Sequence, residues 1–181
     1  WSTNDPEWGI LGTPVVSNDR KTLYVVAWHD DGPQGIRYKL HALDPASGAE
    51  RKSAVIGVSS VYPSQPCKRQ SAFNPCTQKQ RSALLLSDGV LYIGLGGDGS
   101  RGALFAFDAA SLTQKAFWSA TPTGADGGIW QSGQGPAADA EGNVYVMTAN
   151  GTFDGGTNKK NEGDSFVKLH FGGRNLVVRD Y

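Results

Sequence analysis

The fold is decided by the stretch SALLLSDGVLYIGLGG (residues 82–97) and, four residues later, GALFAFDAASL (residues 102–112). This stretch gives an apolar strand, a turn built on Asp and Gly, a strand with the core Leu-Tyr-Ile, and a third alternating strand. The same order of events occurs in residues 13–48 and in residues 135–171. Self-similarity of this kind is the sequence signature of a repeat architecture.

Three tyrosines fix the register of the repeat. Tyr24, Tyr92 and Tyr145 are separated by 68 and 53 residues. A four-stranded propeller blade takes roughly 40–50 residues, so the first interval holds a blade and an insertion. Residues 58–80 are rich in Pro, Ser, Gln and Cys and lack sustained alternation. They are predicted to form a long loop between two blades.

A fourth strand closes each unit, at residues 50–56, 114–120 and 175–181. Turns containing Asp or Gly precede these strands, and both residues favour tight turns. Repeated four-stranded meanders that bury their faces against each other form a propeller. No stretch shows a sustained helical period. The sequence therefore predicts an all-β fold, a β-propeller fragment of about three four-stranded antiparallel blades.

The whole chain, residues 1–181, is predicted to be part of one propeller domain. Its blades cover about residues 10–57, 81–120 and 134–181. Three blades leave the faces of the first and last unpaired, and large exposed apolar patches are rare on stable monomers. We therefore expect the remaining blades of the same chain or another subunit to cover these faces. Because the sequence starts at Trp1 without a Met, we also expect the natural N-terminus to be missing, together with any export signal.

The composition argues against several partners. Lys plus Arg and Asp plus Glu both number 17, so no bulk charge favours nucleic acid or an anionic membrane. No apolar run approaches the roughly 20 residues that a membrane-spanning helix needs. Serine-hydrolase, phosphate-loop and nucleic-acid motifs are missing from the sequence. We expect no nucleic-acid partner and no membrane span.

The two cysteines, Cys67 and Cys76, lie nine residues apart. This spacing fits a small surface loop closed by a disulfide, and two free thiols are the alternative. A zinc site is disfavoured because structural zinc takes four ligands and the three histidines show no finger-like spacing. A disulfide favours a periplasmic or extracellular location.

The third-strand segments resemble the repeats of the pyrroloquinoline-quinone-type (quinoprotein dehydrogenase-like) β-propellers. A blade of that superfamily carries Tyr-Val, then Leu-x-Ala-Leu-Asp-x-x-Thr/Ser-Gly, and then a Trp that docks onto the next blade. LHALDPASG (residues 40–48) matches in the first blade, and LFAFD (residues 104–108) with Trp118 matches in the second. The wider text, in residues 6–16, 81–96, 127–154 and 163–169, is similar to exported propeller proteins of acidobacterial type.

This resemblance implies the propeller fold and says almost nothing about activity. The first blade has Lys52-Ser53-Ala54 where the docking Trp is expected. The quinoprotein alcohol dehydrogenases have an adjacent Cys–Cys pair over their cofactor, and this chain does not. No stretch matches their catalytic Asp base or calcium ligands. No cofactor is therefore expected in this fragment, and quinone with Ca²⁺ belongs only to the interpretation in which the catalytic residues lie outside it.

Trp130, Gln131 and Gln134 are the candidate ligand-binding residues. An aromatic ring with amides at the mouth of a propeller can bind a sugar or peptide by stacking and hydrogen bonding. The alternative is that Trp130 packs between blades while the neighbouring glycines form a turn. Trp8 lies in a similar place before another glycine-containing stretch, which favours the structural interpretation.

Candidate calcium ligands are Asp154 and Asp164, which like Asp98 lie in loops dense with oxygen atoms. EF-hand spacing is absent, so turn formation is the alternative. Asn150 begins a glycosylation sequon, but Asn-Gly is first a turn signal.

The histidines give no clear catalytic constellation. His29 precedes two carboxylates and suits a base, half of a metal site, or a solvated loop tip. His41 and His170 are expected at comparable strand positions, with an architectural or surface role.

The leading interpretation is a non-catalytic propeller segment of an exported bacterial protein that serves as a binding or assembly scaffold. The alternatives are a portion of a quinone-dependent dehydrogenase and a carbohydrate-binding propeller. The predicted partners are the other blades and a protein or glycan ligand. A fold alone does not specify a function.

Overall fold

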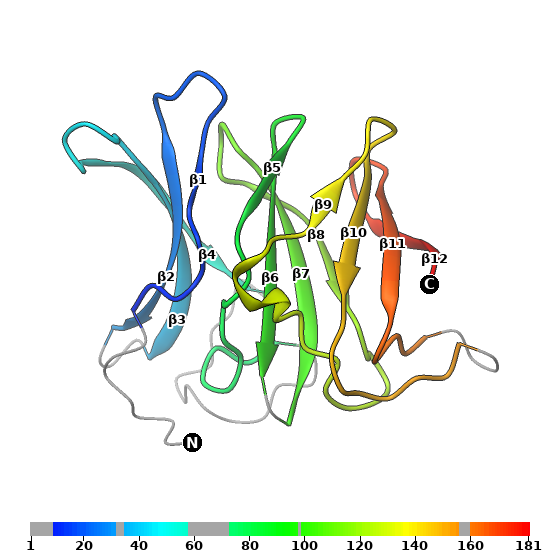
Figure 1. The fold of residues 1–181 in the computed structure, drawn as a ribbon. Coiled ribbons are helices and arrows are strands. Elements are labelled where there is room, and N and C mark those ends of the chain that lie inside the picture. The colour runs from blue at the N-terminus through cyan, green and yellow to red at the C-terminus, as the bar shows by residue number, and fades with distance from the viewer. Residues whose placement is uncertain (1–8, 32–34, 58–72, 98, 156–159) are drawn as a thin grey trace.

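The computed structural model describes residues 9–31, 35–57, 73–97, 99–155 and 160–181. Three four-stranded antiparallel sheets stand side by side in chain order, and each sheet is one blade (Figure 1). Within every blade the strands are paired in the order in which they occur in the sequence. The predicted all-β propeller fragment with three blades is therefore confirmed.

In each blade the first strand is very short and the second and third strands are longer. Blade 1 contains β1 (Val15–Val16), β2 (Leu23–Asp30), β3 (Ile36–Leu43) and β4 (Glu50–Ile56). Blade 2 contains β5 (Leu85–Ser87), β6 (Val90–Gly97), β7 (Ser100–Asp108) and β8 (Gln114–Ser119). Blade 3 contains β9 (Ala137–Ala138), β10 (Asn143–Met147), β11 (Phe166–Phe171) and β12 (Leu176–Asp180). Among the described residues the helical element is a single 3₁₀ turn, η2 (Gln131–Gly133).

An irregularity in the pairing of the third and fourth strands aligns the three blades. It falls between Ala42 and Leu43 in blade 1, between Ala106 and Phe107 in blade 2, and between Lys168 and Leu169 in blade 3. Bulges add local twist and fix register. The residues that flank the irregularity are therefore structural equivalents, as are Tyr24, Tyr92 and Tyr145, which pair with its first member.

Aspartates at the turns act as the sequence predicts. Asp44 Oδ1 accepts hydrogen bonds from the backbone N–H groups of Ala46 (2.9 Å) and Ser47 (3.0 Å). Asp108 Oδ1 accepts one from Ser111 (2.8 Å) in the corresponding turn of blade 2. Side-chain oxygens that bond nearby backbone N–H groups hold such turns in place.

The core consists of two apolar clusters, one on each side of blade 2. The first joins blades 1 and 2 and contains Tyr38, Leu40, Ile93, Phe105 and Phe107, among others. The second joins blades 2 and 3 through Leu104, Ile129, Val144, Val167 and Leu169. Successive residues of β7 therefore point to opposite neighbours, as the alternation of a strand requires.

The insertion between blades 1 and 2 contributes to the core. Residues 58–72 lie outside the described residues, but Phe73 and Cys76 belong to the first cluster. The Trp28 indole N–H donates to the carbonyl of Pro75 (3.1 Å), and the Tyr38 hydroxyl donates to that of Gln78 (3.0 Å). The described part of the insertion therefore packs between blades.

The cysteine prediction is only partly addressed. Cys76 is buried, so this end of the expected surface loop lies in the core. Cys67 lies outside the described residues, and the disulfide stays a prediction. In the part of the chain that is described, no helix is long and apolar enough to cross a membrane.

Candidate functional site

The two ends of the blades differ in their connections. At the turn end, tight turns join the first strand to the second and the third to the fourth. At the linker end, loops join the second and third strands, and longer segments connect successive blades (Figure 1). The predicted ligand and calcium residues belong to loops or linkers of the linker end, and we take this end as the candidate site.

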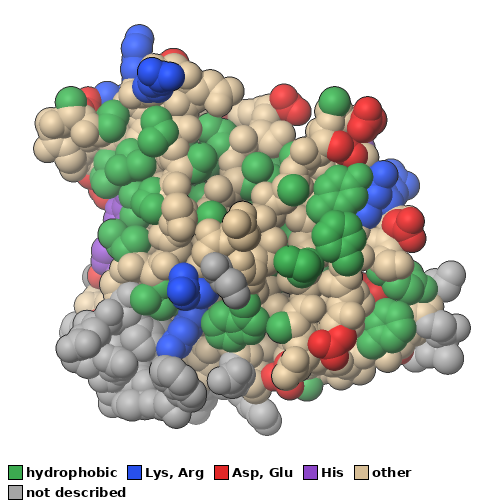
Figure 2. Space-filling model, in the orientation of Figure 1, with side chains coloured by type: hydrophobic (Ala, Val, Ile, Leu, Met, Phe, Trp, Pro, Cys, Tyr) green, Lys and Arg blue, Asp and Glu red, His purple; other side chains and the backbone are tan. Residues whose placement is uncertain are grey.

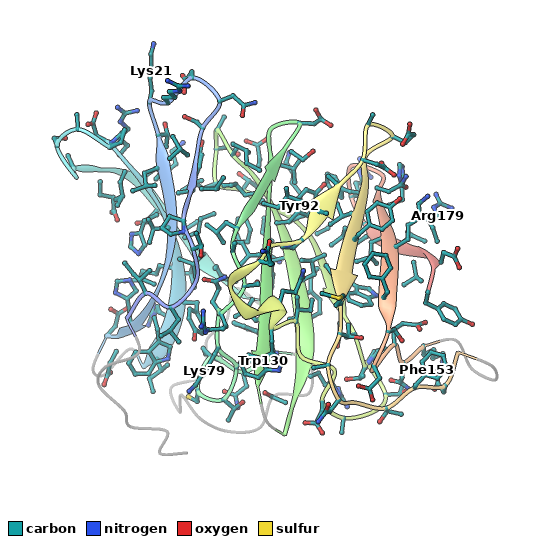
Figure 3. The ribbon with its side chains drawn as sticks, in the orientation of Figure 1. Lys21, Lys79, Tyr92, Trp130, Phe153 and Arg179 are labelled. Atoms are coloured by element: carbon teal, nitrogen blue, oxygen red, sulfur yellow. The ribbon has the colours of Figure 1, made fainter. Side chains whose placement is uncertain are left out.

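Trp130 lies in the segment that connects blades 2 and 3, and its indole ring rests on bare backbone. A Cβ atom at Gly96 would lie 2.9 Å from Trp130 Cε2, and one at Gly128 would lie 2.6 Å from Nε1. Neither position can carry a side chain without displacing the ring. Lys79 pairs with Gly96 through the backbone, and Figure 3 places Lys79 and Trp130 near each other at the linker end. Trp130 remains half-exposed, so packing and ligand binding are both compatible with its position.

The two glutamines follow Trp130 around the η2 turn. Gln131 has a left-handed backbone (φ 45°), and its side-chain Nε2 donates to the carbonyl of Gly135 (2.9 Å). Its buried Oε1 has no hydrogen-bond partner in the described structure. Gln134 is exposed, and its carbonyl accepts from the backbone N–H of Ala83 (2.9 Å). Gln131 thus supports the turn, Gln134 faces solvent, and their ligand role stays a prediction.

Asp154 closes the long loop between β10 and β11. Its Oδ1 accepts hydrogen bonds from the backbone N–H groups of Asn161 and Lys160, each at 2.9 Å, and its Oδ2 accepts from Asn161 Nδ2 (2.6 Å). These bonds, first that of the Asn161 backbone, lower the pKa of the Asp154 carboxyl. The Asn161 amide also bonds to Thr123 Oγ1 (2.9 Å), which ties the loop to the linker.

Asp164 and Asn150 occupy exposed positions nearby. Asp164 adopts a left-handed turn conformation (φ 49°). Among the described side chains, no group of three or more His, Cys, Asp and Glu lies so as to hold a metal ion. Asp98 lies outside the described residues. The calcium prediction is not tested by these observations, nor is glycosylation at Asn150.

Glu162 is a functional candidate that sequence reasoning missed. Its side chain is almost fully buried, at 1% exposed, and Oε2 has no hydrogen-bond partner within the described residues. Burial, followed by the charge of Asp154, raises the pKa of this carboxyl. A buried carboxyl of this kind is held closer to its neutral form. Its sequence neighbourhood, NEG, reads as a polar loop, so no signal marked the burial.

A polar network covers the side of blade 1 that faces away from blade 2. His29 Nε2 lies 2.9 Å from His41 Nε2, and His41 Nδ1 bonds to Glu50. Asp31 forms ion pairs with Arg37 (2.9 Å) and Lys39 (3.0 Å). His29 therefore belongs to a hydrogen-bonded network on the sheet. Burial, followed by the charge of Lys39, lowers its pKa.

The expected equivalence of His41 and His170 is wrong. The bulge alignment makes Phe105 and Val167 the counterparts of His41, because each comes one residue before the bulge residue Ala42, Ala106 or Lys168. His170 is the counterpart of Asp108 and bonds through Nδ1 to Asn143 Oδ1 (3.1 Å). The similar letters LHA and LHF are therefore three residues out of register.

Comparisons with known proteins bear on the fold. No protein-family model matches the sequence, and no curated protein does. The structure is similar to the quinohemoprotein alcohol dehydrogenase of Comamonas testosteroni, with a TM-score of 0.57 and 20% identity over 96% of this chain and 28% of that one. A quinohemoprotein alcohol dehydrogenase of Pseudomonas putida HK5 gives a TM-score of 0.60 and 16% identity over 87% of this chain and 25% of that one.

These likenesses are of fold, because both identities are low. The chain spans about a quarter of the length of each dehydrogenase. The blade order, the shared bulge and the Asp-centred turns agree with the resemblance seen in the sequence. The chain has the fold of a three-blade segment of a pyrroloquinoline-quinone-type β-propeller.

Proposed function

We propose that this chain is a non-catalytic β-propeller segment of an exported bacterial protein and that it serves as a binding or assembly scaffold. The observation that carries this proposal is the open face of blade 3, which we define by Tyr145, Met147, Phe166 and Val177. Three of these side chains are strongly exposed, Met147 at 51%, Phe166 at 59% and Val177 at 46%. Apolar groups of this size are normally covered in a stable assembly.

The aromatic side chains on the open face of blade 3 contact one another and a lysine. The rings of Tyr145 and Phe166 stack at 5.9 Å between centroids, and the Lys168 ammonium lies 5.7 Å from the centroid of the Tyr145 ring. Hydrophobic side chains gather over β10 and β11 in the space-filling view (Figure 2). The face therefore combines stacked aromatic rings with one cationic side chain beside them.

Another β-blade is the partner that best fits this face. The bulge alignment makes Tyr145 and Phe166 the counterparts of Tyr92 and Leu104, which blade 3 covers in the second core cluster. A blade from the rest of the same chain or from another subunit would cover Tyr145 and Phe166 in the same way. Burying an exposed side chain of this size contributes roughly 1.5–3 kcal/mol.

Sedimentation velocity on the chain over a range of concentrations tests the proposal. We expect concentration-dependent association that a Phe166→Asp, Val177→Asp double variant abolishes. Val16→Asp is the matched control, because Val16 is 46% exposed but lies on β1, away from the open face. A wild-type chain that stays monomeric and does not bind a hydrophobic dye would remove the basis for the scaffold.

A portion of a quinone-dependent dehydrogenase is the second candidate, favoured by the likeness to two quinohemoprotein alcohol dehydrogenases. Its catalytic residues would lie outside this segment. Adding the quinone and Ca²⁺ to the full-length protein separates the two proposals. Tight binding with dye-linked alcohol oxidation would replace the scaffold proposal, and absence of both would remove the enzyme.

A carbohydrate-binding propeller is the third candidate, favoured by the half-exposed Trp130 ring on its glycine backbone. Glycan-array binding that is lost in Trp130→Ala would support it. A glycan signal that is unchanged in that variant would exclude Trp130 as the binding residue.

The proposed periplasmic or extracellular location is tested separately by fractionating cells that express the full-length protein.

A further inference from the structure

A pocket opens between blades 2 and 3 at the turn end, away from the candidate site. Its volume is about 280 Å³, and its walls include Ser87, Asp88, Val90, Tyr92, Val144 and Phe171. Liquid water occupies about 30 Å³ per molecule, so the pocket can hold a small organic molecule. We call it the interblade pocket.

The hydroxyl of Tyr92 distinguishes this pocket from the rest of the repeat. The equivalent Tyr24 hydroxyl donates to the carbonyl of Ala109 (3.1 Å), and the Tyr145 hydroxyl donates to Asp139 Oδ2 (2.8 Å). Tyr92 is only 4% exposed, and its hydroxyl makes no hydrogen bond to another described residue. The hydroxyl is not among the buried side-chain atoms that lack a partner in the described structure, so it is accessible from the pocket that Tyr92 lines. It is therefore a donor on the pocket wall that a ligand can use.

A change in the turn of blade 3 explains why Tyr92 has no partner. Tyr24 bonds to Ala109, which directly follows the end of β7 at Asp108. The counterpart of Ala109 is Phe171, two residues after the bulge, where β11 still continues and pairs with Leu176. The Phe171 ring stands edge-on to Tyr92, with 6.4 Å between centroids. An aromatic wall therefore replaces the turn carbonyl.

The polar groups of the pocket specify the chemistry of a ligand. The Tyr92 hydroxyl offers a donor on the pocket wall. Burial of the residue, followed by the charge of Asp88, raises its pKa to about 12, so it remains a phenol at neutral pH. Asp88 is exposed and offers a carboxylate at the rim. The apolar part of the pocket lining includes Phe171, Val90 and Val144. An oxygen acceptor, an aromatic ring and a cation are the complementary groups.

We propose that the interblade pocket binds a small aromatic amine that carries an oxygen acceptor. The oxygen accepts from the Tyr92 hydroxyl, the ring lies against Phe171, and the ammonium lies near Asp88. The interblade pocket lies apart from the open face of blade 3, so ligand binding in the pocket does not depend on the proposed scaffold function.

Titration calorimetry on the chain tests this proposal with three probes. Tyramine carries all three features, 2-phenylethylamine lacks the oxygen, and 3-(4-hydroxyphenyl)propionate replaces the ammonium with a carboxylate. We expect tyramine to bind in the millimolar range, as its size allows. Loss of one hydrogen bond should weaken 2-phenylethylamine by about fivefold, and the propionate should not bind measurably.

Two pairs of variants assign the contacts. Tyr92→Phe should weaken tyramine by about fivefold and leave 2-phenylethylamine unchanged, whereas Tyr24→Phe, at the equivalent position in another blade, should change neither. Asp88→Asn should weaken both amines. Asp164→Asn is its control, because both aspartates are exposed with a left-handed φ, 48° and 49°, which Asn tolerates.

The outcomes are decisive in both directions. Equal affinity for tyramine and 2-phenylethylamine, or tyramine binding unchanged in Tyr92→Phe, would overturn the assignment of the hydroxyl. No binding of either amine at about 10 mM, above the millimolar constant expected for this size, would overturn the site. Circular dichroism of each variant verifies that the comparison is between folded proteins.

Discussion

Blades 2 and 3 are built on the same plan, but their strands are buried differently. In β7, residues 102–107 are buried on both faces, because blade 1 covers one side and blade 3 the other. In β11, buried Val167 and Leu169 alternate with exposed or half-exposed neighbours. The difference shows that the neighbours of a blade, more than its own strands, determine how much of its apolar surface is removed from water.

The two open faces differ from each other as well. The open face of blade 1 carries the His29–His41–Glu50 network and the ion pairs of Asp31. The open face of blade 3 is apolar and aromatic. The chain therefore presents one polar and one apolar face, and only the apolar face gains greatly from being covered.

The largest expected effect is the difference in the free energy of unfolding between removing a buried ring, Phe105, and removing an exposed ring, Phe166. Phe105 is fully buried and its ring contacts those of Phe73, Phe107 and Phe117. Phe105→Ala should lower the free energy of unfolding by about 3–5 kcal/mol. Phe166→Ala, on the open face, should change it by less than about 0.5 kcal/mol in the monomer. Urea denaturation followed by circular dichroism measures both.

Similar losses of unfolding free energy for the two variants would contradict the proposed difference in burial between blades 2 and 3. It would mean that Phe166 is covered in the protein as it exists in solution. Repeating the measurement at high dilution distinguishes covering by a second copy, which dilution removes, from covering within one chain.

An intermediate effect is expected from the equivalent tyrosines. Tyr24→Phe removes a hydrogen bond to the Ala109 carbonyl and should cost about 1 kcal/mol. Tyr92→Phe removes a hydroxyl with no partner in the described structure and should be neutral or slightly stabilising. Thermal unfolding of both variants, without ligand, tests this. A larger loss of stability for Tyr92→Phe than for Tyr24→Phe would show that the Tyr92 hydroxyl does have a hydrogen-bond partner in the folded protein.

The smallest effect concerns pH and the polar face. Burial and Lys39 lower the pKa of His29 below its ordinary value of 6.5. The unfolded chain therefore takes up a proton near pH 6.5, while the folded chain does so only at lower pH. The contribution of His29 is fully present above pH 6.5 and is lost as the pH falls toward the folded pKa.

Urea denaturation at a series of pH values measures this slope. We expect His29→Gln to flatten it, while His170→Gln, outside the network of blade 1, should leave it in place. The pKa values of Asp31 and Glu50 are also lowered, from 3.8 and 4.5, so these carboxylates lose their contribution in a separate, more acidic window. A slope unchanged in His29→Gln would exclude this histidine as its source.

The sequence predicted the repeat well because turns and alternation are local properties. The three tyrosines, the Asp-centred turns and the Gly172-Gly173 turn of blade 3 lie where their patterns indicate. Each depends on residues that are close in the chain, and turn chemistry and a period of two are visible in the letters.

What the sequence did not reveal depends on register and on long-range contact. His170 resembled His41 in its neighbours, but the shared bulge places it at the turn position of Asp108. The burial of Glu162 and the isolation of the Tyr92 hydroxyl arise from packing between segments distant in the chain. No local pattern encodes either feature.

Native-state hydrogen exchange tests most directly the claim that blade 2 is held from both sides and its neighbours from one. We expect the amides of β6 and β7 to exchange slowest, through global unfolding, and those of β12 to exchange fastest among the strands, through local opening. Strand β12 has one paired neighbour and largely exposed side chains, which favours such opening. Protection in β12 equal to that in β7 would contradict the account.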